Sequence, residues 1–172
     1  VRNYGYALAH AAEAIRADRA IVLAAVQKRG RALAHAFSAL KADRAVVLAA
    51  VQQDGEALEH ATEALKADRA IVLAAVQQNR EAFRFAASTL QGDREFVLAA
   101  VRQNGLALGL ALGLALVHET AWFGADREVV TVAVRQNGCA LRYAAPALRA
   151  DATIVLAAVR QNGLALACAS EA

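Results

Sequence analysis

The chain has 172 residues, of which 58% are hydrophobic and only 5% are aromatic, and it carries 19 basic and 16 acidic residues. Apolar content made mostly of Ala, Leu and Val is typical of closely packed helices, and a single proline with 20% charged residues argues against a disordered chain. Residues 1–50 hold eight basic and three acidic groups while residues 51–100 hold five and eight, a pattern that suits protein surfaces better than a polyanion track.

Six aspartates mark a repeat along the chain. They are 25, 25, 25, 33 and 25 positions apart, and each opens a version of the phrase DRAIVLAAVQQNG: Asp18, Asp43, Asp68, Asp93, Asp126 and Asp151. Self-similarity at a fixed period predicts a tandem array of one small helical unit. We expect residues 1–172 to form a single array whose repeats start at residues 5, 30, 55, 80, 105, 138 and 163. Because both ends fall inside a repeat, we also expect an interior piece of a longer protein.

The repeat at residues 55–79 shows the expected elements. Its first half has apolar residues at spacings of 3 and 4, which predicts an amphipathic helix, the outer helix. Asp68 then stands where the N-cap of a second helix belongs. The run Ile71–Val76 is apolar all round, which predicts a buried inner helix.

Each inner helix ends on Gln, then Asn or Asp, then usually Gly. The glycines Gly55, Gly105, Gly138 and Gly163 favour a left-handed helix stop, and Arg80, which replaces one of them, should be strained there. With the aspartate caps, this predicts two helices of about ten residues in each repeat. The fold class is therefore an all-α, right-handed α-solenoid of helix-turn-helix repeats.

One interval breaks the period. Gly105 and Asp126 are 21 positions apart, whereas the other repeats place the equivalent Gly and Asp 13 apart. Eight extra residues add about 12 Å to a helix, so we expect one lengthened helix after Gly105. This apolar, glycine-striped helix needs cover from the array, a partner protein or a lipid-embedded complex. The candidate contact residues are Leu106, Leu110, Leu114, Trp122 and Phe123.

A histidine column raises the question of a metal site. His10, His35, His60 and His118 share it with Phe85, Tyr143 and Cys168, which indicates a half-buried slot for flat side chains. Neighbouring helices lie about 8–10 Å apart, too far for shared tetrahedral ligation. We therefore expect no metal site. Because no serine has a paired base, we also expect no catalytic residue, and we expect no cofactor.

Charged residues around the caps and turns form two further patterns. Every cap except Asp151 is followed by arginine, which opposes the helix macrodipole and therefore needs a carboxylate on a neighbouring repeat or on a partner. Lys28, Arg29 and Arg31 form a basic cluster on a turn. Its alternatives are a solvated turn and a contact with an acidic protein patch or a phosphate.

The recurring phrase D-R-x-[IV]-V-L-A-A-V-x-Q-[ND]-G-x-A-L resembles the domain-of-unknown-function family 4116 along essentially the whole chain. The resemblance implies tandem helical units of about 25 residues. It also implies kinship with large multidomain proteins of algae and protists, and with some from intracellular bacteria. It implies no activity.

Several signals that are absent from the sequence lead to an expectation about the cellular compartment. Cys139 and Cys168 occupy different columns, so no disulfide framework is implied. The start carries no signal segment, and the longest uncharged apolar run has 13 residues, short of the roughly 20 that span a bilayer. We expect an intracellular protein, cytosolic or organellar, without a transmembrane segment.

These observations favour a non-catalytic scaffold for protein partners, a subunit or segment of a larger assembly. The contact positions would be outer-helix residues that vary between repeats: Arg31, Glu56, Glu59, Glu81, Arg84 and Arg142. A first alternative is a peripheral subunit of a membrane supercomplex, photosynthetic or organellar, docking through residues 106–122. A second is a nucleic-acid or phosphate-binding array, although aromatic platforms for base stacking are absent.

Overall fold

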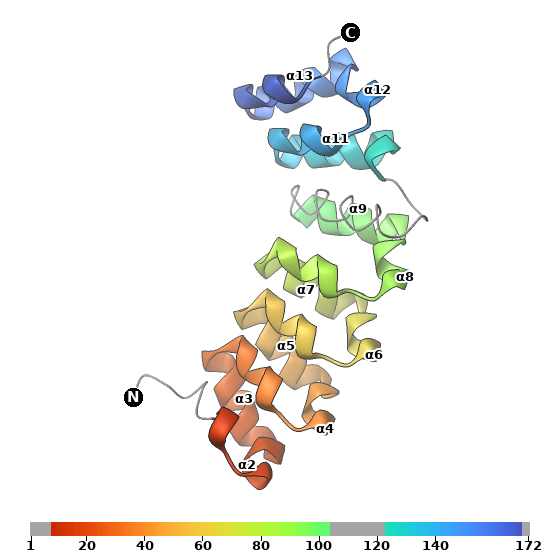
Figure 1. Ribbon diagram of the computed structural model, residues 1–172. Coiled ribbons are helices and arrows are strands. Elements are labelled where there is room, and N and C mark those ends of the chain that lie inside the picture. Colours follow the sequence, from red (N-terminus) through yellow and green to blue (C-terminus); the bar gives the residue numbers. More distant parts are fainter. Residues whose placement is uncertain (1–7, 104–122, 170–172) are drawn as a thin grey trace. The chain divides into compact units, whose positions relative to one another are not determined.

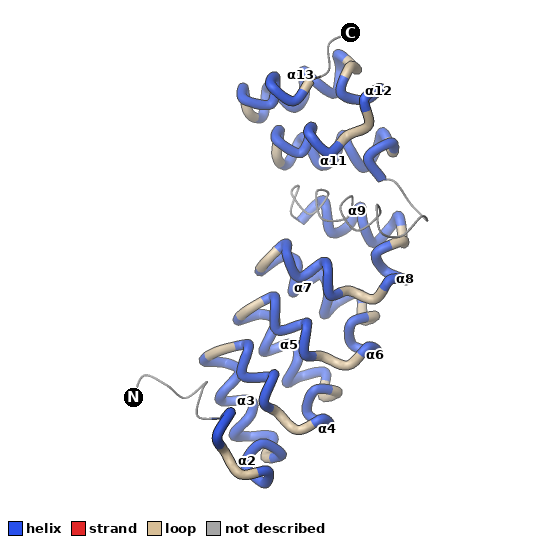
Figure 2. The backbone as a smooth tube through the Cα atoms, in the orientation of Figure 1, coloured by secondary structure: helices blue, strands red, loops and turns tan. Residues whose placement is uncertain are grey.

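The computed structural model describes residues 8–103 and 123–169, and every element in these ranges is a helix (Figure 1). The chain divides into two compact units, residues 1–87 and residues 88–172, which are described separately. Figure 2 shows the short loops that separate successive helices in each unit.

Both units repeat the same three elements: a 3-10 helix (η), a short α-helix and a ten-residue α-helix. Unit 1 contains η1 (Leu8–His10), α2 (Glu13–Ala17), α3 (Arg19–Lys28), η2 (Gly30–His35), α4 (Ser38–Lys41), α5 (Arg44–Gln53), η3 (Gly55–His60), α6 (Glu63–Lys66), α7 (Arg69–Gln78) and η4 (Arg80–Phe85). Unit 2 contains α8 (Ser88–Gln91), α9 (Arg94–Gln103), η5 (Phe123–Ala125), α11 (Arg127–Gln136), η6 (Gly138–Tyr143), α12 (Pro146–Arg149), α13 (Ala152–Gln161) and η7 (Gly163–Cys168).

The inner helices match the prediction in position and length. Within each unit they pack on one another, α3 on α5 and α5 on α7 in unit 1, and α9 on α11 and α11 on α13 in unit 2. The 3-10 helices pack in the same order, η2 on η3, η3 on η4, and η6 on η7. This confirms an all-α helical repeat fold in each unit.

The predicted outer helix is wrong as a single element. In the repeat at residues 55–79 it divides into η3 and α6, with Ala61 in an extended conformation (φ −73°, ψ 160°). The Thr62 N–H donates to the carbonyl of Lys41 in the preceding repeat, at 3.2 Å, instead of to its own helix. Equivalent bonds join Ala87 to Lys66 (2.9 Å) and, in unit 2, Ala145 to Gly124 (2.8 Å). The helix breaks because one amide per repeat bonds across the stack.

The core lies between the inner helices and the 3-10 helices. In α7, Ile71, Val72, Ala75 and Val76 are fully buried, whereas Leu73 is only half-buried. The apolar sequence predicted an inner helix that is covered on every side, whereas in the structure one side of the helix is only half-buried. Complete burial of one Val or Leu side chain contributes about 1.5–3 kcal/mol, so the stack depends on these columns.

The glycines that the structure describes do not end the helices by a left-handed turn, and Gly105 lies outside the described residues. Among the described residues no glycine and no other residue has a positive φ, Arg80 included, so that prediction is wrong. A Cβ on Gly30, Gly55 or Gly138 would instead lie 2.4 Å from a carbonyl oxygen of the next inner helix, closer than van der Waals contact allows. Glycine is needed there because two backbones approach closely.

The lengthened helix predicted after Gly105 lies outside the described residues. No helix in the described ranges is both long and apolar enough to cross a membrane.

Candidate interaction surface

The cap aspartates bind the first turn of each inner helix. One Asp43 oxygen accepts from the Ala45 N–H (2.9 Å) and the Val46 N–H (3.1 Å). The equivalent bonds are made by Asp18, Asp68, Asp126 and Asp151, and Asp93 accepts from the Phe96 N–H at 2.9 Å. The structural caps predicted from the sequence are therefore present.

In Asp43, Asp68, Asp126 and Asp151, the second carboxylate oxygen receives an arginine from the preceding repeat. The guanidinium of Arg19 contacts Asp43 at 2.7 Å, and that of Arg44 contacts Asp68 at 3.0 Å. In unit 2, Arg94 contacts Asp126 at 2.6 Å and Arg127 contacts Asp151 at 2.7 Å. This arginine ladder supplies the neighbouring carboxylate that the macrodipole argument requires.

The ladder lowers the pKa of its carboxyl groups. Hydrogen bonding from the partner arginine holds the pKa of Asp43, Asp126 and Asp151 below the ordinary value, and backbone N–H donors add to the effect. Partial burial raises the pKa of Asp68, but Arg44 and the backbone donors outweigh it and the net shift is downward. These four carboxyl groups therefore stay ionised at a lower pH than a free aspartate does.

A second ladder, which the sequence did not predict, joins glutamine to glycine. The Gly55 N–H donates to Gln78 Oε1 at 2.6 Å, and the Gly138 N–H donates to Gln161 Oε1 at 2.6 Å. The Gln78 side-chain amide in turn donates to the Gln53 carbonyl at 3.4 Å. The glutamine that recurs two positions before the glycine column was the available signal, but the glycine it bonds to lies 23 positions earlier in the chain.

The varying positions expected to contact partners lie on the 3-10 helices. Arg31, Glu59, Arg84 and Arg142 are exposed, while Glu56 and Glu81 are half-buried. Some are already paired: Arg31 contacts Asp54 at 2.9 Å and also Glu56, and Arg80 contacts Glu81 at 3.2 Å. Arg84 and Arg142 also have neighbours, the Phe85 ring and the side chains of Cys168 and Tyr143 respectively. We call these six positions the variable face.

The basic cluster at the turn after α3 has carboxylates beside it, which reduce the local positive charge. Lys28, Arg29 and Arg31 are exposed beside a polar hollow of about 580 Å³. The hollow also includes Asp54, whose hydrogen bond raises the pKa of Arg31. With carboxylates on the Arg31 guanidinium, this structure does not favour a phosphate contact there.

Four segments of the chain match a single family model, Domain of unknown function (DUF4116): residues 1–41, 43–91, 81–112 and 126–172. The chain belongs to this family. Neither the comparison with curated proteins nor that with solved structures gives a match.

The histidine column of this chain is half-buried at four positions, as its mixture of His, Phe and Tyr predicts. His35, His60, Phe85 and Tyr143 are all half-buried, and burial lowers the pKa of His60. Arg84 lies over the Phe85 ring at 4.6 Å from the centroid. In the residues that the structure describes, no three His, Cys, Asp or Glu side chains are placed to share a metal ion. His10 is exposed, Cys168 is half-buried, and His118 falls outside the described residues.

The predicted apolar contact of this DUF4116 chain is described at one residue only. Phe123 is 5% exposed, so its ring belongs to the core of unit 2 rather than to an accessible surface. The other candidates lie outside the described residues: Leu106, Leu110, Leu114 and Trp122.

Proposed function

We propose that this DUF4116 chain is a non-catalytic scaffold that binds protein partners through its variable face. One observation carries the proposal: neighbouring columns of the same 3-10 helices behave in opposite ways. The core column, Leu33, Leu58, Phe83 and Leu141, is apolar and fully buried in these four repeats. The next column outward reads Ala34, Glu59, Arg84 and Arg142, and its charge changes sign between repeats.

A buried apolar column beside a column of varying charge supports recognition of another protein. Within each unit the packed repeats hold their side chains at a regular spacing, so little ordering entropy is lost on binding. Charges of both signs at defined positions select a partner with the complementary pattern and raise the association rate. They suit a polyanion poorly, because the acidic positions repel phosphates.

The two alternative functions have weaker support. Docking to a membrane complex through residues 106–122 rests on residues outside the described ranges. Nucleic-acid binding needs a continuous basic column, whereas the variable face contains Glu59 between Arg31 and Arg84.

The test exchanges charges on the variable face without changing net charge. Glu59→Lys combined with Arg84→Glu should weaken binding of each partner by at least tenfold, which corresponds to about 1.4 kcal/mol. The matched control is Gln52→Lys with Gln77→Glu, on exposed positions of α5 and α7 in neighbouring repeats. Partners are identified by affinity capture and mass spectrometry, and their Kd values are then measured by calorimetry with purified proteins.

Equal Kd values for the exchange and control variants would place the binding surface elsewhere. Capture of no partner by the wild-type chain from its own cells would contradict the scaffold function itself.

A further inference from the structure

One exposed column of the inner helices changes its chemistry between the two units. It lies nine positions after each cap aspartate, close to the end of the helix. In unit 1 the column reads Gln27, Gln52 and Gln77, and in unit 2 it reads Arg102, Arg135 and Arg160. All six residues are exposed. We call the three arginines, which lie on α9, α11 and α13, the Arg102 column.

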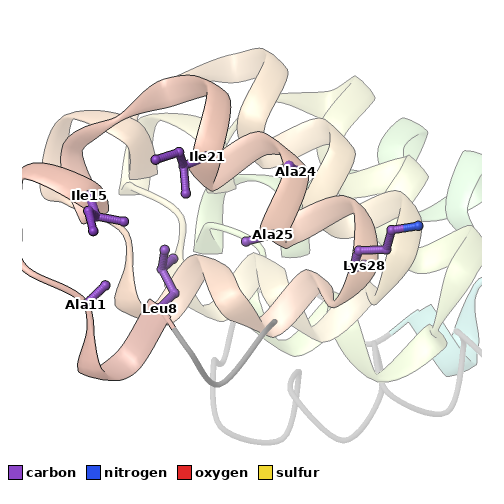
Figure 3. Close-up of a pocket in the computed structure, with 7 residues that line it drawn as sticks. All are labelled: Leu8, Ala11, Ile15, Ile21, Ala24, Ala25 and Lys28. Atoms are coloured by element: carbon purple, nitrogen blue, oxygen red, sulfur yellow. The ribbon is translucent and has the colours of Figure 1, made fainter. Parts of the chain in front are cut away.

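The exposure of this column does not depend on where the described repeats begin. An apolar hollow of about 510 Å³ at the first repeat differs in this respect (Figure 3). Ile15 and Ile21 border the hollow and are exposed. One repeat later, where α3 packs on α5, their equivalents Leu40 and Val46 are buried. The column, in contrast, is exposed even at Gln52, which has described repeats on both sides.

The fold does not require arginine in this column. The helices α3, α5 and α7 carry glutamine there and have ten residues each, the same length as α9, α11 and α13. A cation in the last turn is favoured by the helix macrodipole, but the glutamine helices end at the equivalent residue without one. Neither packing nor helix length therefore explains why unit 2 has a cation at each of these positions.

The Arg102 column carries more positive charge than its surroundings neutralise. Arg102 reaches Glu128 only at 3.9 Å, and that carboxylate is already 2.8 Å from the Arg94 guanidinium. In the part of the chain that the structure describes, Arg135 and Arg160 form no ion pair. An acidic ligand would therefore meet these two guanidinium groups without displacing an internal partner.

The spacing of the column fits one kind of acidic ligand. The helix α9 packs on α11 and α11 packs on α13, and the axes of packed helices lie about 8–10 Å apart. A polyproline II chain has about three residues per turn and rises about 3.1 Å per residue, so every third side chain returns to the same side after about 9 Å. Carboxylates at every third position of such a chain therefore match arginines on successive inner helices.

We propose that the Arg102 column binds an acidic segment of a partner polypeptide, extended as a polyproline II helix with Glu or Asp at every third position. Each guanidinium presents a planar fork of N–H donors that matches a carboxylate. The site uses inner helices of unit 2, whereas the variable face lies on 3-10 helices, so it goes beyond the scaffold function proposed above.

A nucleic acid fits this surface less well than a polypeptide. Glu95 and Glu128 are exposed near the other ends of α9 and α11. Glu95 lies seven positions before Arg102, which places it on the same side of α9 at a distance of about 10 Å. A DNA duplex carries one charge per about 1.7 Å of its axis, so its phosphates would also approach these carboxylates.

The spacing is tested with two labelled peptides of the same composition, EPPEPPEPP and EEEPPPPPP. Binding to the full chain is measured by fluorescence anisotropy at low salt, where exposed charge pairs are least screened. The peptide with Glu at every third position should bind about fivefold more tightly, because only its carboxylates match all three arginines.

The arginines are tested by giving them the residue that unit 1 carries. Arg135→Gln should weaken binding of EPPEPPEPP about threefold, and the triple variant with Arg102→Gln and Arg160→Gln should weaken it about thirtyfold, since separated contributions add. Arg142→Gln removes an exposed arginine from η6 in the same unit and is the matched control. It should leave the affinity unchanged.

A gain of binding is expected in unit 1. The triple variant with Gln27→Arg, Gln52→Arg and Gln77→Arg places a second arginine column on α3, α5 and α7. It should raise the number of EPPEPPEPP peptides bound per chain from one to two, as measured by calorimetry. An unchanged number would contradict recognition by the column alone.

Four further outcomes would overturn the proposal: no saturable binding of EPPEPPEPP, equal affinities for the two peptides, an equal loss in Arg135→Gln and Arg142→Gln, and tighter binding of oligothymidylate than of the peptide through the same arginines. The exchange at Glu59 and Arg84 should leave peptide binding unchanged. Failure here is therefore distinguishable from failure of the scaffold proposal.

Discussion

At the scale of single residues, the cap aspartates connect local and long-range structure. One oxygen of Asp43 accepts two backbone N–H groups of its own helix, and the other accepts the guanidinium of Arg19 from the preceding repeat. The cap function could be predicted from position alone, because an N-cap is a local requirement. For the arginine, the sequence predicted a carboxylate partner on a neighbouring repeat or on another protein, but it did not say which carboxylate.

The two roles of Asp43 can be separated by substitution. Asp43→Ala removes both and should destabilise the chain by about 1–2 kcal/mol, the usual cost of losing a cap. Asp43→Asn retains the cap and removes only the charge, so it should cost less than half as much. Urea unfolding followed by circular dichroism measures both. A loss in Asp43→Asn as large as that in Asp43→Ala would show that the ion pair, not the cap, dominates.

At the scale of elements, the inner helices were predicted correctly and the outer helix was not. The inner helix has a local start signal, Asp, and a long apolar run, so its limits follow from adjacent residues. The outer segment breaks at Ala61 and Thr62 because the Thr62 amide bonds to Lys41 in the preceding repeat. Its apolar spacing also fits a continuous helix, and nothing local selects against one.

The glycine columns set how closely successive helices approach. Gly55→Ala places a Cβ against the Ala75 carbonyl and should destabilise unit 1 by about 1–3 kcal/mol. Gly163→Ala is the matched control, because a Cβ at that position would have no neighbour within 4 Å among the described residues. Since alanine restricts the unfolded chain, that substitution should be neutral or stabilising by up to about 1 kcal/mol. Thermal unfolding by calorimetry distinguishes the two, and equal melting temperatures would contradict the close approach.

At the scale of the whole molecule, the arginine ladder makes the stability of the folded chain depend on pH in the acidic range. Asp43, Asp68, Asp126 and Asp151 each have a pKa below the ordinary value in the folded chain. The stabilisation from a depressed carboxyl pKa is fully present above the unfolded value of about 4 and is lost as the pH falls through the folded value. His60, with its pKa lowered by burial, adds a loss in the same direction that begins below about pH 6.5.

We therefore expect the melting temperature to be nearly constant from about pH 7 to about pH 8 and to fall steadily below about pH 4. Replacing both Arg19 and Arg44 with Gln should flatten the acid limb, because the carboxyl pKa values of Asp43 and Asp68 then rise toward the unfolded value. Calorimetry at intervals of one pH unit measures the slope. An acid limb of the same slope in this variant would assign the acid dependence to the backbone donors instead.

The sequence by itself determined the repeat, the caps and the inner helices, since each depends on a short local pattern that recurs every 25 residues. Only the tertiary structure decided the break in the outer segment, the glutamine ladder, the reason for the glycines and the burial of Phe123. These features depend on what the adjacent repeat places within a few ångströms. The residues beside such a hydrogen bond or close backbone approach along the chain do not say which residue 20–25 positions away takes part in it.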